Sequence, residues 1–406
     1  MYSSNQRFMK KQKEPNWLTF LRIVLACVFI FSGLMKAVDP VASGIKMDDY
    51  FISFGMGFMH PFSLTLGILM NIAEFVLGFM LLFRIRVNLT ALGFLLFMLF
   101  FFFLTGWLAI AEHLEVNYGY NLHVVKDCGC FGQAIAMSNM ETFLKNVALM
   151  ILTLIIFGKR KAIPDIHLTI FGQWLLAFIG AGMALLIQFY CLRNLPLIDF
   201  SNWKKETFVE RLLKKETNVV PLFIEQPAEI EILFLYQNSD GVEKLLSMEE
   251  MDNITETEPN FYAEFSYVDR IDSVIVEAVH PKFSGFSMID KQGRDFASFY
   301  LNSAQVYILF MHDLDETNDK AMKSEKFKKL VTYCEENNID FVGITNSSYD
   351  DIAKFVETYE INFPIYYNPI DPVKGPFIVR DAIRSNPGLI VLKNGMVTEK
   401  KAWRNF

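Results

Sequence analysis

The stretch Leu95-Leu-Phe-Met-Leu-Phe-Phe-Phe-Phe-Leu104 decides the fold class, because it contains no polar side chain that could face water. A membrane-spanning helix needs about 20 mostly apolar residues to cross a hydrocarbon core of about 30 Å. The run Leu89–Ala111 around this stretch meets that requirement. Four further runs also meet it: Trp17–Val38, Phe62–Phe83, Met140–Phe157 and Leu168–Cys191. We therefore expect a membrane domain of five helices over residues 17–191.

Basic residues in short loops indicate the orientation, since loops rich in Lys and Arg stay in the cytoplasm. Three basic segments alternate with acidic ones along the chain: Arg7–Lys13, Arg84–Arg86 and Lys159–Lys161. The acidic connections are residues 39–61 and 112–139. This alternation predicts a cytoplasmic tail at residues 1–16 and an extracytoplasmic location for everything after Cys191. The first helix is long and no small-residue cleavage site follows it, so we expect a retained anchor.

The two halves of the chain differ in charge. Residues 1–195 hold fifteen Lys and Arg against ten Asp and Glu, whereas residues 196–406 hold 23 against 35. Hydrophobic residues make up 52% of the whole chain, more than a typical globular domain contains. The pattern fits a membrane half that contacts lipid and an acidic soluble half, and it argues against nucleic acid as a partner.

Two ionisable side chains lie within the apolar runs. Glu74 falls midway along the second run and Lys36 near the outer end of the first. A carboxylate at that depth should face the interior of the helix bundle, and Asn71 shares its face one turn earlier. The sequence leaves two interpretations open: a packing contact, or a role in proton transfer or substrate contact.

The second outer connection carries Asp127-Cys-Gly-Cys-Phe-Gly132. Cys128 and Cys130 can close a disulfide only across a sharp turn, which Gly129 makes easier. So small a ring is strained, and strain raises the reduction potential, which favours an exchanging disulfide over a structural one. The alternatives are a static bridge, two free thiols, or a metal site with His113 and His123. That spacing matches no common zinc pattern, and we predict no metal.

The other three cysteines are dispersed. Cys27 and Cys191 belong to apolar runs, and Cys334 lies within an expected helix. Isolated cysteines in such positions usually behave as small core hydrophobes. We assign them no chemistry.

Three motifs resemble the DoxX/MauE membrane family, whose MauE-type members are associated with methylamine utilisation. They are the segment Arg22–Ala37, the pair Glu74 and Gly78, and the Asp127–Gly132 string. The resemblance covers residues 15–160 and implies a four-helix core in a bacterial inner membrane, supporting thiol or respiratory redox chemistry on the periplasmic side. The fifth helix and the C-terminal extension depart from that pattern.

The remaining chain divides into a linker at 192–216, a small β-rich extension at 217–280 and a domain at 281–406. In the extension, Ile230–Gln237 and Ser273–Ala278 predict strands, with a turn at Asn238–Gly241. In the domain, a hairpin is expected over Phe286–Asp295. Strands and helices then alternate: strand Gln305–Met311, helix Ala321–Asn337, strand Phe341–Thr345, helix Tyr349–Tyr359, a segment at Pro364–Tyr367, strand Leu389–Leu392 and strand Met396–Glu399.

This order resembles an α/β thioredoxin-like domain of the TlpA or peroxiredoxin-like kind. Ser385–Gly388 is similar to the family's cis-proline turn, which implies that Pro387 lies beside a partner-binding surface. The catalytic thiol pair is missing, because the segment after the first core strand reads His312-Asp-Leu-Asp-Glu-Thr317. A thiolate is the nucleophile in dithiol exchange, so this domain cannot carry out that reaction alone.

The sequence thus favours extracytoplasmic redox chemistry at Cys128 and Cys130, with the soluble domain docking a protein client or redox partner. A membrane quinone is a possible electron acceptor, by analogy with other four-helix thiol oxidases. The competing hypothesis is a non-enzymatic membrane scaffold. A small-solute transporter has little support, because no inverted repeat is visible.

Overall fold

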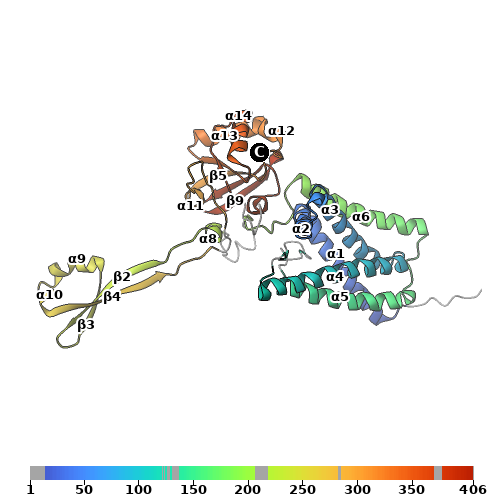
Figure 1. Cartoon of the computed structure of the whole chain (residues 1–406), viewed down its shortest axis with the longest axis horizontal. Helices are drawn as coiled ribbons and strands as arrows, with labels where there is room; N and C mark the ends of the chain where they lie inside the picture. Colours follow the sequence, from blue (N-terminus) through green and yellow to red (C-terminus); the bar gives the residue numbers. More distant parts are fainter. Residues whose placement is uncertain are drawn as a thin grey trace, which may run out of the picture. The chain divides into compact units, whose positions relative to one another are not determined.

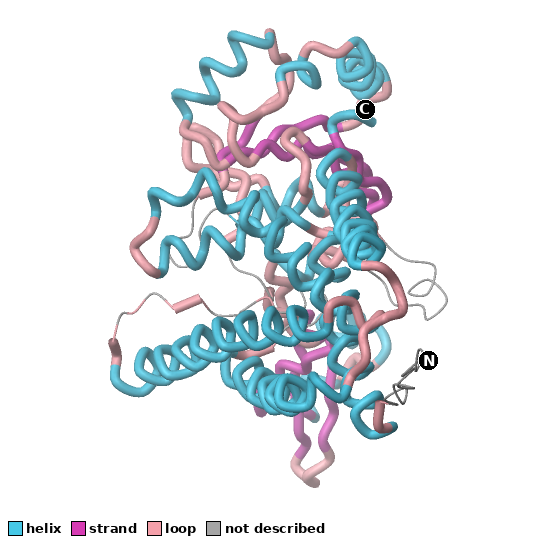
Figure 2. Tube along the Cα trace, turned by 90° about the vertical axis from the view of Figure 1, so that its right-hand side faces the viewer, coloured by secondary structure: helices cyan, strands magenta, loops and turns pink. Residues whose placement is uncertain are grey.

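The computed structural model describes residues 14–120, 122, 124–125, 129, 137–205, 218–281, 285–369 and 377–405. Backbone contacts divide the chain into two compact units, Met1–Ser201 and Asn202–Phe406. The first unit is helical, and the second holds the described strands, which are magenta in Figure 2. The change in architecture therefore falls just after the last long apolar helix.

Five described helices of the first unit are long and apolar enough to cross a membrane. They are α1 Asn16–Val38, α3 Ser63–Leu82, α4 Val87–Tyr118, α5 Asn139–Lys159 and α6 Ile170–Arg193 (Figure 1). A 3-10 helix, η1 Gly57–Phe62, leads into α3, and another, η2 Arg160–Ala162, follows α5. The predicted five-helix membrane fold is confirmed.

Helix α4 is longer than the sequence predicted. The apolar run ends at Ala111, but the helix has 32 residues and continues to Tyr118, where Gly119 adopts φ +70° and ends it. A helix of that length spans about 48 Å at about 1.5 Å per residue, more than the roughly 30 Å of the hydrocarbon core. A hydropathy pattern detects only the part of a helix that lies in lipid.

The connection between α1 and α3 contains a helix that was not predicted, α2 Pro40–Ser53. Asp39 caps it, since its Oδ1 accepts a hydrogen bond from the Ala42 N–H at 3.0 Å, and Pro40 occupies the first helical position. An acidic residue followed by proline is a recognised helix start signal. That signal was present at residues 39–40.

Helices α1 and α3 approach each other closely because glycines lie where they meet. A Cβ atom at Gly33 would stand 2.8 Å from the Phe75 backbone nitrogen, and one at Gly78 would stand 2.8 Å from that of Ile30. Small residues allow this approach between membrane helices, where packing replaces the hydrophobic effect. Gly33 lies nearly one turn before Lys36 and Phe75 follows Glu74, so this contact also brings the two ionisable side chains together.

The second unit begins with a small antiparallel sheet in the order β3-β2-β4. Its strands are β2 Glu229–Asn238, β3 Glu243–Ser247 and β4 Phe265–Val276. Two short helices accompany it, α9 Met248–Thr257 and α10 Phe261–Glu264. A third, α8 Val220–Phe223, precedes β2, and its Phe223 packs against Phe286. The predicted strand at 230–237 is confirmed. The second strand starts earlier than predicted, because charged residues at 269–272 obscure its apolar pattern.

The larger sheet has the order β7-β6-β5-β8-β9, with β5, β6 and β7 parallel and β8 and β9 antiparallel. Its strands are β5 Gln305–Met311, β6 Asp340–Thr345, β7 Ile365–Tyr367, β8 Gly388–Lys393 and β9 Met396–Ala402. The accompanying helices are α11 Ala297–Leu301, α12 Asp319–Met322, α13 Glu325–Glu336, α14 Tyr349–Tyr359, α15 Phe377–Ala382 and η3 Trp403–Asn405. This arrangement confirms the predicted thioredoxin-like fold class.

The helix predicted at Ala321–Asn337 is two helices. Ser324 separates α12 from α13, and its hydroxyl accepts a hydrogen bond from the Phe327 N–H at 3.1 Å. Serine at that position starts a new helix instead of continuing the old one.

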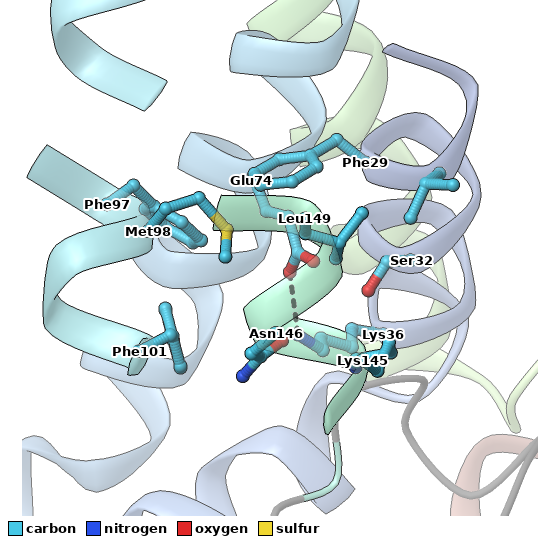
Figure 3. A pocket seen from close by; sticks show the side chains of 11 residues that line it. Phe29, Ser32, Lys36, Glu74, Phe97, Met98, Phe101, Lys145, Asn146 and Leu149 are labelled. Atoms are coloured by element: carbon cyan, nitrogen blue, oxygen red, sulfur yellow. Dashed lines mark hydrogen bonds and ion pairs between the residues drawn. The ribbon is translucent and has the colours of Figure 1, made fainter. Parts of the chain in front are cut away.

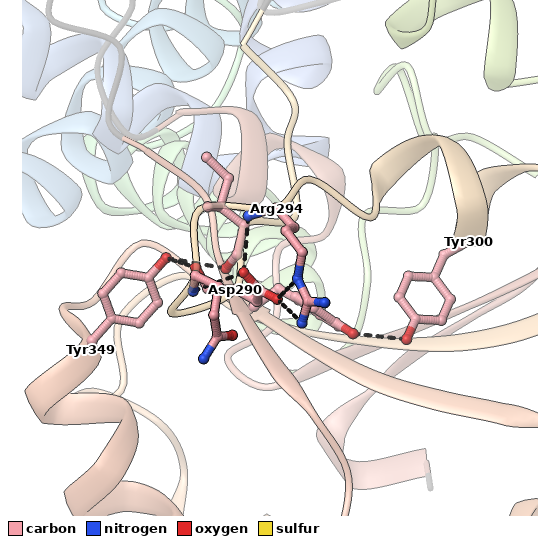
Figure 4. Close-up of polar contacts among 7 residues, drawn as sticks. Asp290, Arg294, Tyr300 and Tyr349 are labelled. Atoms are coloured by element: carbon pink, nitrogen blue, oxygen red, sulfur yellow. Dashed lines mark hydrogen bonds and ion pairs between the residues drawn. The ribbon is translucent and has the colours of Figure 1, made fainter.

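The hairpin expected over residues 286–295 is a tight turn with a single bridge between Ile289 and Asp295. The Asp290 carboxylate holds the turn, accepting from the Arg294 backbone N–H at 2.9 Å and from its Nε at 2.7 Å. The Tyr349 hydroxyl donates to the Asp290 carbonyl oxygen at 2.7 Å (Figure 4). The turn is therefore attached to α14 and does not extend as a two-stranded ribbon.

Trp203 anchors the segment expected as a linker. Its side chain is 1% exposed and packs against Phe223, Phe286 and Phe310, with ring centroids 4.9 to 5.2 Å apart. Trp203 is thus packed into the second unit, although it lies in the segment expected as a linker.

Candidate functional site within the membrane helices

A small cavity lies among α1, α3, α4 and α5 (Figure 3). Its volume is about 30 Å³. Aromatic and sulfur-containing side chains form part of the wall, namely Phe29, Phe97, Met98 and Phe101. The polar part of the wall consists of Ser32, Lys36, Glu74, Lys145 and Asn146. Such a concentration of polar groups inside apolar helices marks the cavity as a candidate site.

An ion pair between Lys36 and Glu74 lines this cavity. Lys36 Nζ donates to Glu74 Oε2 at 2.6 Å, and the two side chains are only 15% and 9% exposed (Figure 3). Opposite charges at this distance offset much of the cost of removing each from water. The sequence analysis identified both residues but not their pairing. Their opposite charges, each isolated in an apolar run, were an available signal.

Asn71 lies one turn from Glu74 on α3 but contacts a different set of residues. Its amide donates to Ser43 Oγ and to Gln188 Oε1, both at 3.0 Å, and to the Lys36 carbonyl oxygen at 3.3 Å. These contacts join α1, α2, α3 and α6, and Asn71 does not line the cavity. Gln188 was missed by the sequence analysis, although it is a polar residue within the last apolar run.

The α5 side of the cavity was also missed. Asn146 is buried, and its amide donates to Thr105 Oγ1 at 3.2 Å, which in turn donates to the Phe101 carbonyl oxygen at 2.7 Å. Lys145 precedes it in the second turn of α5. Both residues lie near the start of an apolar run. Charged and amide side chains are common at the ends of membrane helices, so they did not stand out as site residues.

The size of the cavity limits what it can hold. A single water needs roughly 10–15 Å³ measured in this way, so about 30 Å³ accommodates about two waters. The ring of a quinone is too large for this space. The cavity therefore has room for water, and the carboxylate, ammonium and amide groups of its wall can hydrogen-bond to it.

Cys128 and Cys130 lie outside the described residues. The described Gly129 between them has φ +62°, a conformation that favours glycine. Nearby, Val125 is buried, and its carbonyl oxygen accepts from the Asn139 amide at 3.0 Å. The Glu115 carboxylate accepts from the Leu122 N–H at 2.8 Å. The first part of the connection, around Leu122 and Val125, is thus attached to both α4 and α5.

The described residues contain no group of three or more His, Cys, Asp or Glu side chains placed to hold a metal ion. Of the four residues weighed as ligands in the sequence, only His113 is described. Its Nδ1 lies 3.0 Å from the Asn117 amide nitrogen, one turn along α4.

In the second unit, the segment that replaces the thiol pair lies against the proline turn. The Asn386–Pro387 peptide bond is cis. The Asn386 amide donates to the Asp313 carbonyl oxygen at 2.7 Å, and Thr317 Oγ1 lies 3.3 Å from Asn386 Oδ1. The two segments that the resemblance to a thioredoxin fold singled out therefore adjoin each other in the folded chain.

Among the described residues near the proline turn, no side chain supplies the missing nucleophile. Burial, and then the charge of Arg380, lowers the pKa of His312 to about 4, so the imidazole is neutral at pH 7. Cys334 is 0% exposed in α13, and burial raises the pKa of its thiol to about 11. A neutral, buried thiol is a poor nucleophile.

Comparison with known proteins identifies two families. Residues 15–158 match the family model described as methylamine utilisation protein MauE, and residues 279–399 match that of the AhpC/TSA family. No curated protein and no solved structure matches the chain. The predicted fusion is confirmed: a MauE-type membrane segment precedes a thioredoxin-like segment of the AhpC/TSA type. The pairing indicates a membrane-associated, redox-related function.

Proposed function

We propose that this protein carries out thiol–disulfide exchange on the extracytoplasmic side of the membrane, with Cys128 and Cys130 as the reactive pair. The observation that carries the proposal is the location of the other thiols. The chain has five cysteines, and the second unit contains only Cys334, which is fully buried. Cys27 and Cys191 belong to α1 and α6, inside the apolar helices.

Electrons and protons balance between the two client thiols and the Cys128–Cys130 pair. A client thiolate attacks the Cys128–Cys130 disulfide and forms a mixed disulfide, which the second client thiolate resolves. The client loses two electrons and two protons, and the pair gains them as two thiols. The reverse reaction reduces a client disulfide, and the relative reduction potentials set the direction.

Proton transfer gives the membrane cavity a role in this reaction. Each change between dithiol and disulfide releases or takes up two protons. Glu74 Oε2, bridged to Lys36 and beside space for water, is a proton acceptor and donor of the right chemistry. We assign the Lys36–Glu74 pair to this step, whereas Asn71 holds the surrounding helices together.

Contacts between the basic loops support the proposed orientation. The Ile166 N–H donates to the Arg84 carbonyl oxygen at 2.9 Å, and the Val87 N–H donates to Asp165 Oδ1 at 2.8 Å. Near the start of α1, Arg22 donates to the Leu81 carbonyl oxygen at 3.0 Å. The loop with Arg84 and Arg86 and the connection that follows Lys159–Lys161 therefore lie at the same end of the bundle as the start of α1, as expected if that end faces the cytoplasm of a bacterial inner membrane.

The second unit would serve as a docking module. Its cis-proline turn at Pro387 is retained without a thiol pair, so a client could be held there but not oxidised or reduced there. Extended chains commonly bind beside exposed backbone groups of such a fold.

Alkylation of intact cells, followed by mass-shift analysis, tests the proposal. We expect Cys128 and Cys130 to change together between protected and alkylated states when cells are moved from oxidising to reducing medium. Cys128→Ser should leave Cys130 alkylated or trapped in a mixed disulfide, and the matched control Cys334→Ser should change nothing. An invariant state of both thiols under the two conditions would refute the proposal.

A non-enzymatic scaffold is the second candidate, favoured by the absence of any thiol in residues 312–317. The double variant Cys128→Ser/Cys130→Ser separates the two. Full complementation of a deletion strain by this variant would support the scaffold and contradict thiol exchange.

A further inference from the structure

Strand β4 is a long edge strand. It has 12 residues, and in the three-stranded sheet its only described partner strand is β2. On the other side of β2, strand β3 covers only Leu233–Gln237. The part of the sheet in which β2 residues 229–232 pair with β4 residues 272–276 is therefore a two-stranded ribbon. Such ribbons are marginally stable in water, and an edge strand is a template for further pairing.

The exposed side chains of β4 are unusually apolar for such a ribbon. Tyr267, Val268, Val274 and Ile275 are 50% to 63% exposed. Within the same strand, Arg270 forms a bidentate pair with Asp272, with Nε to Oδ1 at 2.7 Å and Nη2 to Oδ2 at 3.1 Å. Apolar residues thus flank a short charged centre on both sides.

We propose that β4 pairs antiparallel with β4 of a second copy of this chain, about a two-fold axis at Ile271. In this register Arg270 of each copy lies opposite Asp272 of the other, giving two complementary charge pairs. Directly opposed charge pairs of this kind stabilise antiparallel strands. On both sides of this centre, the apolar residues Tyr267 and Val268 of one copy face the end of the strand that carries Val274 and Ile275 of the other.

The charges discriminate against neighbouring registers. A two-fold axis perpendicular to the sheet must pass through one residue and place it opposite its own copy. An axis at residue 269, 270 or 272 would oppose Asp269, Arg270 or Asp272 to the same charge, which is destabilising. Among these central positions, only Ile271 avoids a like-charge pair.

The two register shifts in β4 lie outside the residues next to Ile271. The register between β2 and β4 shifts near Val268 and near Ile275, whereas residues 269–274 pair regularly. A second copy would turn each marginal ribbon into an inner part of one continuous sheet. This interface is independent of the proposed thiol chemistry.

Charge reversal of the full-length protein in detergent tests the register, with native mass spectrometry as the readout. Wild type is expected to form dimers. Arg270→Glu places acidic side chains opposite each other and should weaken dimerisation on the order of tenfold. The double variant Arg270→Glu/Asp272→Arg restores opposite charges in the same register and should restore the dimer. A monomeric wild type, or a double variant no better than Arg270→Glu, would overturn the proposal.

Cross-linking in membranes provides a second measurement that does not depend on detergent. In a Cys128→Ser/Cys130→Ser background, Ile271→Cys is expected to form a disulfide between copies rapidly when an oxidant is added. Leu245→Cys is the matched control, because Leu245 is 50% exposed on β3, away from the β4 edge. Equal cross-linking rates for the two variants would contradict pairing of β4 with its copy.

Discussion

At the scale of single residues, the Lys36–Glu74 pair is costly to break, because both charges are largely buried, and it is also the group proposed to transfer protons. Glu74→Gln would remove the carboxylate that lies 2.6 Å from the mostly buried Lys36 ammonium. We expect this variant to lose about 3–5 kcal/mol of stability, as is typical when one partner of a buried pair is removed. Lys36→Met/Glu74→Leu removes both charges and should recover most of that loss. Thermal unfolding in detergent measures both effects.

The same variants decide whether the pair takes part in exchange. If it carries protons, the folded double variant should remain slow in cycling Cys128 and Cys130. Glu14→Gln is the matched control, since Glu14 forms a buried pair with Arg22 at 2.9 Å, outside the cavity lining. It should reduce stability while leaving exchange intact. Normal exchange in the double variant would identify Lys36–Glu74 as a packing contact only.

His312 predicts a pH dependence of the second unit. Its folded-state pKa of about 4 lies below the usual value near 6.5, so between these limits the unfolded chain binds more protons than the folded one. Stability should therefore fall by up to about 3 kcal/mol as the pH drops from about 6.5 to about 4. His312→Asn should flatten this dependence, measured by urea unfolding with hydrogen exchange of β5. His280→Asn, at a largely exposed histidine, should not.

At the scale of helices and strands, the elements predicted correctly are those with an unbroken pattern. The membrane helices follow from runs such as 95–104, and β5 and α14 match their predicted limits because alternation or helical periodicity spans the whole element. Short elements, such as α11 and α15, escaped prediction because five or six residues carry too little periodicity.

The candidate site was only partly predictable for a related reason. Lys36, Glu74 and Asn71 stand out as polar residues in apolar runs, but their pairing depends on how two helices meet. The close approach at Gly33 and Phe75 decides that Lys36 reaches Glu74, while Asn71 turns toward Gln188 on α6. No one-dimensional pattern reports the partner of a side chain. Pro387 was placed correctly in a cis-proline turn because its local motif is distinctive.

At the scale of the whole molecule, the two units have separate cores. Leu25, Phe29 and Phe94 belong to the core of the first, and Leu309, Phe341 and Leu389 to a core of the second. Each core is built within its own unit, so a cut between them should leave both folded. We proposed that the first unit carries out the thiol chemistry and that the second unit binds the client. Their covalent connection is what joins the two activities.

A protease site inserted after Leu197, which is 57% exposed, tests this division in the full-length protein. Cleavage should leave exchange with dithiothreitol unchanged, because a small dithiol needs no docking. Exchange with reduced, unfolded ribonuclease A should fall on the order of tenfold or more, because separation removes the high effective concentration that a tethered docking module provides. A site inserted in the exposed turn at Asp240 is the control, since cleavage there does not separate the units. If cleavage after Leu197 slows neither reaction, the second unit does not deliver clients to Cys128 and Cys130.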